Sequence, residues 1–306
     1  MQEYNYKGKL ILGVDHGYGN MKTAHRIFPA SVEKNPQFGT NLLEYNGEVY
    51  NIGGAHKEFK VEKIGDDDYY LLTLAALAEE LYFRGKTEAI VHLAAGLPLY
   101  WVKEQKEEFQ KYLLREEKVV FTYRNEKYQI TFAGASIFPQ GFAALAKNLG
   151  EMKGMSIMAD IGNGTINVMF LDNGKPIAGK FYTEQYGTYQ CIKLARNELI
   201  KMCKGEVPDS IVEEVIRKGT SDIPKSYIKA ISEVVQTYVE QVFCKLREYG
   251  YNEDLMKLYV IGGGGCLIQN FADYDGNRII INQDICATAK GYEYLALQTL
   301  RKQGGN

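Results

Sequence analysis

The chain has 306 residues, of which 45% are hydrophobic and 24% are charged. This composition is that of a folded globular protein and excludes disordered, collagenous and coiled-coil chains. At about 150 residues per domain, the length predicts two domains or one large bilobal fold. The net charge of -2 gives no positive field that would hold nucleic acid or an anionic membrane.

The five cysteines are odd in number and widely spaced, without the C-x-x-C pairs of zinc or iron-sulfur sites. They favour reduced thiols in a cytosolic protein. The first ten residues lack the basic and apolar regions of a signal peptide, and no apolar run approaches the roughly 18 residues of a membrane span. We therefore expect a soluble, cytoplasmic protein.

Taken in chain order, the first half predicts strands and hairpins around one long helix. Residues 10–14 predict a strand that ends at Asp15 before a glycine-rich turn, and Met21 begins a returning strand. Asn46-Gly47 predicts a two-residue hairpin turn. Further elements are expected as a helix over 69–83, a strand over 89–93, a hairpin formed by 119–123 and 128–132, and a helix over 140–149.

The middle of the chain repeats the opening pattern. Residues 155–159 are apolar, Asp160 follows, Gly162-Asn163-Gly164 turns the chain, and 165–171 runs back. Helices are then expected over 188–204, 209–218, 226–249 and 287–303, with a strand over 258–261 that leads into four glycines. The repeated unit of strand, aspartate, glycine turn and returning strand predicts two related lobes.

The most common nucleotide-binding motifs are absent. Gly85-Lys86-Thr87 looks like the end of a P-loop, but Glu80 stands where the motif requires glycine. Each G-x-G-x-x-G candidate lacks its last glycine. A glycine turn between strands can still wrap a phosphate with backbone N–H groups, and a strand-end carboxylate can hold hydrated Mg²⁺ beside it. Each turn taken singly also fits a tight β-turn with a solvated aspartate.

Four segments resemble the actin, Hsp70 and sugar-kinase superfamily. Asp15-His16-Gly17-Tyr18-Gly19-Asn20-Met21-Lys22 resembles its first phosphate loop, and Asp160-Ile161-Gly162-Asn163-Gly164-Thr165 its second. Val260-Ile261-Gly262-Gly263-Gly264-Gly265 resembles its adenosine motif, and Pro139-Gln140-Gly141-Phe142-Ala143-Ala144 its connecting helix. Within the superfamily, the loop pattern, Gly96-Leu97-Pro98 and the length most resemble the ParM-type plasmid-segregation actins.

This resemblance implies an α/β fold of the bilobal, actin-like (ribonuclease H-like) type, with two related lobes around a nucleotide cleft. The first lobe would comprise residues 1–155 and 284–306, and the second lobe residues 156–283. The implied function is an actin-like ATPase that binds and hydrolyses ATP or GTP with Mg²⁺ and polymerises into dynamic filaments that segregate plasmid DNA. The implied partners are further copies of the chain and an adaptor protein bound to plasmid centromeric DNA, with no direct binding of nucleic acid or membrane.

The resemblance also implies site residues. Asp15 and Asp160 would orient Mg²⁺ through its waters, Lys22 would pair with the β- and γ-phosphates, and Gln140 would hold the attacking water, with Asp160 and Asn167 completing the catalytic set. The remaining nucleotide contacts would come from Gly17, Tyr18, Gly19, Asn20, Gly162, Asn163, Gly164, Thr165, Gly262, Gly263, Gly264 and Gly265.

Two residues depart from the family pattern. Asn167 stands where relatives often have Asp or His, and an amide can orient water but cannot accept its proton. His16 stands where Asp or Asn is common, and it fits either a place near the Mg²⁺ waters or a surface loop. The alternatives to a filament-forming ATPase are a small-molecule kinase that does not polymerise and a nucleotide-gated scaffold on the same fold.

Overall fold

The computed structural model describes residues 3–17, 19–54, 67–203 and 205–304. The chain divides into two compact units, one formed by residues 1–147 and 286–306 and the other by residues 148–285. Each unit has its own sheet and its own apolar core. Within the described residues, no helix combines the length and apolarity needed to cross a membrane.

The first unit is built on a ten-stranded sheet in the order β4-β3-β2-β8-β10-β9-β6-β7-β5, with β1 paired to β2. The strands are β1 (Asn5–Tyr6), β2 (Lys9–His16), β3 (Asn20–Lys22), β4 (Ile27–Pro29), β5 (Val32–Lys34), β6 (Leu42–Tyr45), β7 (Glu48–Ile52), β8 (Glu88–Leu97), β9 (Lys118–Tyr123) and β10 (Glu126–Pro139). The hairpins expected at Asn46-Gly47 and between β9 and β10 are both formed. Their turn residues Asn46, Gly47, Arg124 and Asn125 have positive φ angles, as such tight turns require.

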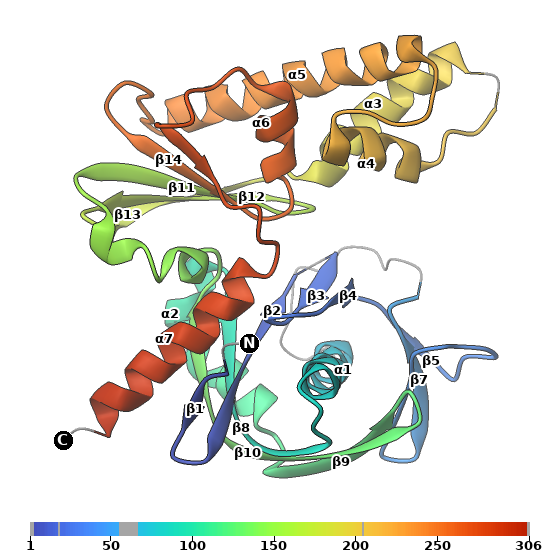
Figure 1. Ribbon diagram of the computed structural model, residues 1–306, viewed down its shortest axis with the longest axis vertical. Coiled ribbons are helices and arrows are strands. Elements are labelled where there is room, and N and C mark those ends of the chain that lie inside the picture. Colours follow the sequence, from blue (N-terminus) through green and yellow to red (C-terminus); the bar gives the residue numbers. More distant parts are fainter. Residues whose placement is uncertain (1–2, 18, 55–66, 204, 305–306) are drawn as a thin grey trace. The chain divides into compact units, whose positions relative to one another are not determined.

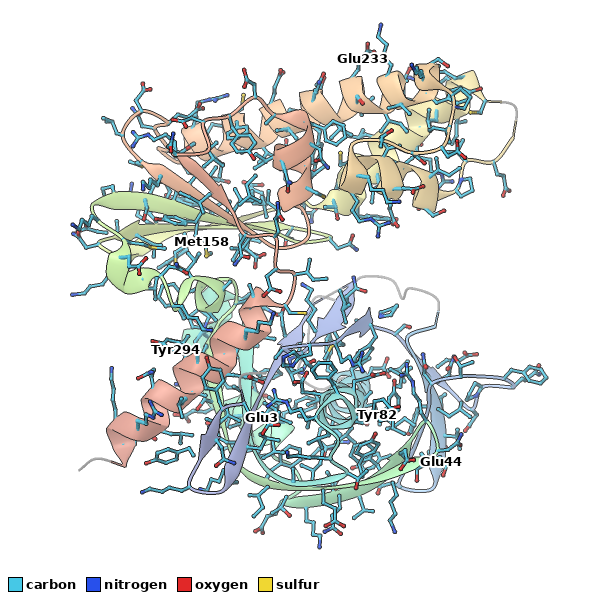
Figure 2. All side chains as sticks on the ribbon, in the orientation of Figure 1. Glu3, Glu44, Tyr82, Met158, Glu233 and Tyr294 are labelled. Atoms are coloured by element: carbon cyan, nitrogen blue, oxygen red, sulfur yellow. The ribbon has the colours of Figure 1, made fainter. Side chains whose placement is uncertain are left out.

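The sheet curls around helix α1 (Asp67–Phe83) (Figure 1). Strands β4 and β5 stand at opposite ends of the sheet order, yet only Ala30 and Ser31 separate them in the chain. Every residue of α1 from Tyr69 to Leu81 is buried, and side chains fill the space between this helix and the strands (Figure 2). A helix that is apolar on nearly all sides is stable only when it is enclosed in this way.

Two further helices cover the first unit, α2 (Leu99–Leu113) and α7 (Ala287–Gln303). Helix α7 lies so close to the sheet that a Cβ at Gly13 would collide with the backbone oxygen of Ala289. Similarly, a Cβ at Gly96 would collide with the Tyr292 ring. The last helix of the chain is therefore part of the same core as the first strands.

The second unit has a five-stranded sheet in the order β13-β12-β11-β14-β15. Its elements are β11 (Met155–Ile161), β12 (Ile166–Asp172), β13 (Lys175–Glu184), α3 (Thr188–Met202), α4 (Asp209–Lys218), α5 (Lys225–Glu248), β14 (Lys257–Ile261), α6 (Gly265–Phe271) and β15 (Ile279–Ile281). In α5, one stripe that runs from Ile231 to Leu246 is buried, as the apolar periodicity predicted. Figure 1 shows α3 and α5 running alongside each other.

One expected element is wrong. The helix predicted over 140–149 is replaced by two short 3₁₀ turns, η1 (Phe142–Leu145) and η2 (Leu149–Glu151). Strand β10 continues to Pro139, and Gly141 then takes a left-handed φ of 76° that an α-helix cannot include. The backbone of α7 at Gly291 packs directly against the Ala143 oxygen, so tertiary packing decides the path of this segment.

Candidate functional site

The first of two glycine turns, residues 15–22, joins β2 to β3 in the first unit. Asp15 is the next-to-last residue of β2 and lies directly opposite Lys22 in the antiparallel register. Lys22 Nζ is 3.5 Å from Asp15 Oδ2. Asp15 is 7% exposed, so a buried strand presents this carboxylate at its end beside a lysine. Tyr18 lies outside the described residues.

The first turn is tight enough to require glycine. The Gly17 N–H donates to the Asp15 carbonyl at 3.1 Å, and a Cβ at Gly17 would stand 2.5 Å from the Asn20 carbonyl oxygen. The Gly19 carbonyl accepts a hydrogen bond from the Ala30 N–H at 3.0 Å. Gly17 therefore packs closely against the Asn20 backbone, and the backbone groups of Gly17 and Gly19 already form hydrogen bonds within the unit.

Gln140 reaches the first turn from another part of the sheet. Its backbone N–H donates to the Leu97 carbonyl at 2.8 Å, at the end of the β8–β10 ladder. Its Nε2 donates to Asp15 Oδ1 and to the His16 carbonyl, each at 3.3 Å. The structure thus brings together three of the residues that the sequence singled out, Asp15, Lys22 and Gln140.

His16 fits neither alternative considered from the sequence. Its side chain is fully buried, Nε2 is 2.8 Å from Thr73 Oγ1, and the ring packs edge-on against Phe109. Successive side chains of a strand point to opposite faces, so Asp15 and His16 are directed to different sides of β2. His16 is a core residue.

The second glycine turn, residues 160–165, joins β11 to β12 in the second unit. Asp160 lies opposite Asn167 on β12 and beside Ile261 on β14. The turn is closed by a hydrogen bond from the Gly162 N–H to the Thr165 carbonyl at 2.9 Å. Asn167 Oδ1 accepts a hydrogen bond from Thr183 Oγ1 at 2.9 Å, so its amide already has a fixed neighbour on β13.

The four glycines at 262–265 pack against the second turn. Gly262 has a φ of 83°, and a Cβ there would stand 2.6 Å from Asp160 Oδ1. The Gly264 N–H donates to the Ile161 carbonyl at 2.9 Å. Gly263 has open space around its Cβ position, and Gly265 begins α6. Asp160, the second turn and the glycine run therefore form one cluster within the second unit.

The sequence predicted that a helix begins at Thr188, where α3 begins, but it did not predict that the start of this helix packs against the second turn. The Thr188 N–H donates to the Gly162 carbonyl at 3.0 Å, and the Tyr189 N–H donates to the Asn163 carbonyl at 2.9 Å. A Cβ at Gly187 would collide with the same Asn163 oxygen. Gln190 Nε2 donates to the Gly164 carbonyl at 2.9 Å. The available signal was Gly187 at the start of a predicted helix with Gln190 three residues later, a spacing typical of helix N-termini.

The donor set in each unit fits a phosphate and a hydrated cation. Mg²⁺ is usually held by one or two carboxylates together with waters and substrate phosphates, and each cluster offers one strand-end aspartate beside a tight glycine turn. The described ranges contain no group of three or more Asp, Glu, His or Cys side chains suited to a metal ion. A cation at either aspartate would therefore depend on phosphate and water for its other ligands.

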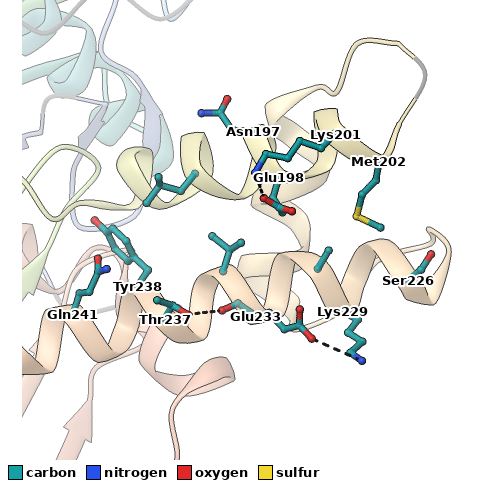
Figure 3. Close-up of a pocket in the computed structure, with 13 residues that line it drawn as sticks. Asn197, Glu198, Lys201, Met202, Ser226, Lys229, Glu233, Thr237, Tyr238 and Gln241 are labelled. Atoms are coloured by element: carbon teal, nitrogen blue, oxygen red, sulfur yellow. Dashed lines mark hydrogen bonds and ion pairs between the residues drawn. The ribbon is translucent and has the colours of Figure 1, made fainter.

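A separate groove lies between α3 and α5 in the second unit (Figure 3). Its volume is about 750 Å³, and none of the sequence-predicted site residues line it. Its rim carries the ion pairs Glu198–Lys201 and Lys229–Glu233, and no glycine turn opens onto it. The groove lacks the features of a phosphate site, although Tyr238 in its lining donates from its hydroxyl to the Gly187 carbonyl at 2.8 Å.

Residues 13–142 match the family model of the actin-like proteins N-terminal domain. This segment includes the first turn and Gln140. No curated protein matches the chain.

Solved structures share the fold over almost the whole chain. The archaeal actin homolog Ta0583, in its complex with ADP, is 20% identical with a TM-score of 0.74, covering 94% of this chain and 99% of its own. The Alp12 filament structure is 16% identical with a TM-score of 0.71, covering 96% and 100%. Bacillus thuringiensis ParM with ATP is 15% identical with a TM-score of 0.70, covering 98% and 100%. The likeness therefore extends over both compact units.

Proposed function

We propose that this chain, which has the α/β, bilobal fold of actin-like proteins, is an actin-like ATPase of the ParM type that binds ATP or GTP with Mg²⁺, hydrolyses the nucleotide and assembles into filaments. The observation that carries the proposal is the approach of Gln140 Nε2 to Asp15 beside Lys22. The carboxylate and the lysine belong to one tight turn and the amide reaches it from the end of β10, and these groups suit the positioning of water, cation and phosphate in phosphoryl hydrolysis.

In the first unit, Lys22 exchanges its contact with Asp15 for the β- and γ-phosphates, where its compact positive charge opposes theirs. Asp15 then orients waters of the cation. When bound, Mg²⁺ neutralises charge that develops on the phosphates during transfer. Gln140 holds the attacking water in line, a positioning role because a neutral amide is not a base. The backbone of Gly17, Tyr18, Gly19 and Asn20 contributes phosphate contacts.

In the second unit, Asp160 faces the cation, and the turn formed by Gly162, Asn163, Gly164 and Thr165 contacts the phosphates. The run Gly262, Gly263, Gly264 and Gly265 takes the adenosine or guanosine moiety. The packing of this run against Asp160 supports these assignments, because one ligand can then contact the carboxylate, the turn and the glycine run together. Asn167 assists Gln140 in ordering water.

Assembly is proposed from the fold and from its neighbours. One neighbour is described as a filament structure and another as ParM with ATP. Subunits that join through heterologous contacts which do not close into a ring form helical filaments. We propose that nucleotide-bound copies of this chain join in this way, in the cytoplasm, and that an adaptor protein bound to plasmid centromeric DNA couples the filament to plasmid segregation.

The ATPase proposal is tested by nucleotide binding and by phosphate release from purified protein with Mg²⁺ or with EDTA. We expect Mg²⁺-dependent binding of ATP, slow phosphate release, and loss of binding in Lys22→Ala. Absence of ATP and GTP binding in the presence of Mg²⁺ would contradict the proposal. Sedimentation with different nucleotides tests assembly.

A nucleotide-gated scaffold with negligible turnover is the second candidate. The observation that favours it is the hydrogen bond that Asn167 Oδ1 accepts from Thr183, because it uses one of the two lone pairs with which this oxygen could orient water. Equal phosphate release by the wild type and Gln140→Ala, with nucleotide binding intact, would favour the scaffold over the ATPase.

A further inference from the structure

Two buried carboxylates accept hydrogen bonds from residues on either side of the first turn. On β2, the Gly13 N–H donates to Glu293 Oε1 at 3.2 Å. After β3, Thr23 Oγ1 donates to Glu80 Oε2 at 2.5 Å, and the His25 N–H donates to the same oxygen at 3.2 Å. Gly13 lies two residues before Asp15, and Thr23 directly follows Lys22. The residues that bond to these carboxylates therefore lie directly before and after the residues proposed to contact the nucleotide.

Arg84 joins the two carboxylates. Its Nε donates to Glu80 Oε1 at 2.7 Å, and its Nη2 donates to Glu293 Oε1 at 2.8 Å. The side chains of Arg84 and Glu80 are fully buried, and that of Glu293 is 2% exposed. Glu80 is on α1, Arg84 directly follows the end of α1, and Glu293 is on α7. The end of α1, α7, β2 and the segment after β3 therefore meet at one network of charges.

The two carboxylates share one guanidinium and differ in their surroundings. Burial raises the pKa of Glu293 to about 7 against the opposing charge of Arg84. Burial also acts to raise the pKa of Glu80, but hydrogen bonds from Thr23 and His25 and the charge of Arg84 outweigh it, so its pKa is lowered. Glu80, which holds the lysine side of the turn, is therefore the carboxylate that stays ionised.

A buried charge network of this kind specifies the arrangement of the elements that it joins more than it stabilises the fold. Buried ion pairs lose hydration and are often no more stabilising than apolar side chains of the same volume, but their donors and acceptors can specify one arrangement. At Gly13, the close approach of the Ala289 backbone oxygen also leaves β2 no room to move toward α7. The hydrogen bonds to α7 and α1 therefore fix where the two ends of the turn lie.

We propose that Glu80, Arg84 and Glu293 are positioning residues that clamp the first turn, so that Asp15 and Lys22 are held ready for the phosphates of a nucleoside triphosphate. This inference rests on the proposed nucleotide function. None of the three residues touches the nucleotide. Glu293 acts through Gly13, Glu80 acts through Thr23 and His25, and Arg84 acts through the two carboxylates.

The test compares two hydroxyl deletions next to α1. Thr23→Val removes the hydrogen bond to Glu80. Tyr123→Phe is the matched control, because the buried Tyr123 hydroxyl donates to Glu79 Oε1 at 3.1 Å, one residue away on α1 but not on the first turn. Thr23→Ser keeps the hydroxyl and serves as the rescue variant. The measurements are the Kd of a fluorescent N-methylanthraniloyl ATP with Mg²⁺, and amide hydrogen exchange over residues 13–25 without nucleotide.

We expect Thr23→Val to raise the Kd about tenfold, as loss of a hydrogen bond to a charged group allows, and to speed exchange in residues 13–25. Tyr123→Phe and Thr23→Ser should stay within about twofold of wild type in Kd. Equal effects of Thr23→Val and Tyr123→Phe on Kd, or unchanged exchange in Thr23→Val, would overturn the clamp. Failure of the wild type to bind the probe would instead overturn the proposed function, while the exchange comparison would still decide whether the turn is clamped.

Discussion

Gln140 donates a hydrogen bond from Nε2 to Oδ1 of Asp15, a residue 125 positions earlier in the chain. The contact arises because β10 runs parallel to β8 as far as the pair Pro139 and Leu97, which places the next residue at the edge of the sheet where β2 ends. The parallel pairing of β10 with β8 therefore places the Gln140 amide and the Asp15 carboxylate where both can contact one ligand.

Gln140→Ala should lower phosphate release by about a hundredfold, because loss of a positioning group costs that order of rate, while ATP affinity stays within about twofold. The measurement is steady-state phosphate release together with the Kd for ATP. The control is Gln110→Ala, which removes an amide that donates to the Ala135 carbonyl at 2.7 Å in the same unit. A similar loss of rate in both variants would show that the effect is structural.

Glu293→Gln should change how stability depends on pH. Burial raises the pKa of Glu293 from 4.5 to about 7, with Arg84 opposing the shift and Glu80 adding to it; His25 also contacts Glu80 in this network. Between these two values the folded state binds more protons than the unfolded state, so the free energy of unfolding falls as pH rises through this window.

Urea unfolding of the wild type and of Glu293→Gln at pH 5, 6, 7 and 8 measures this contribution. The free energy of unfolding of the wild type should fall relative to the variant by about 2 to 3 kcal/mol from the lowest to the highest pH. Parallel pH profiles for the two proteins would contradict the raised pKa of Glu293.

Local patterns predicted most of the elements. Asn46-Gly47 specifies its own hairpin through two positive φ angles, and the apolar stripe of α5 specifies its buried face. The expected helix over 140–149 failed because Gly141 and the packing of Gly291 against Ala143 override a local helical pattern. Nothing local predicts that Arg84 bonds Glu293, 209 positions away.

For the candidate site, too, the sequence predicted the residues of contiguous motifs but not the contacts between separate elements. Strand, aspartate and glycine turn are contiguous in the sequence, so Asp15 and Asp160 could be singled out. The start of α3 against Asn163 and the clamp behind the first turn depend on contacts between separate elements, and such contacts leave no periodic trace in the sequence.

Gly187→Ala should disrupt the second turn. The added Cβ would collide with the backbone oxygen of Asn163, and backbone atoms cannot rotate away as a side chain can. Forcing a side chain into a closely packed site costs about 1 to 3 kcal/mol, and we expect weaker ATP binding as the turn shifts. Gly276→Ala is the control, since a Cβ there meets nothing within 4 Å. Equal ATP affinity and melting temperature in the two variants would refute this account of the turn.

Tyr238→Phe should lower the free energy of unfolding by about 1 kcal/mol, because it removes the buried hydrogen bond from the tyrosine hydroxyl to the Gly187 carbonyl. Tyr251→Phe is the matched variant. Its hydroxyl is also buried but has no hydrogen-bond partner among the described residues, so its removal should be neutral or slightly stabilising. Guanidinium unfolding of both variants decides the point, and equal destabilisation would contradict it.

Nucleotide-dependent assembly is tested most directly by ultracentrifugation of the purified protein with ATP, a slowly hydrolysed ATP analogue, ADP or no nucleotide, with negative-stain microscopy of the pellets. We expect filaments with ATP and with the analogue, few with ADP, and none for Lys22→Ala. Protein that binds ATP yet stays in the supernatant under every condition, across protein concentration and salt, would contradict it.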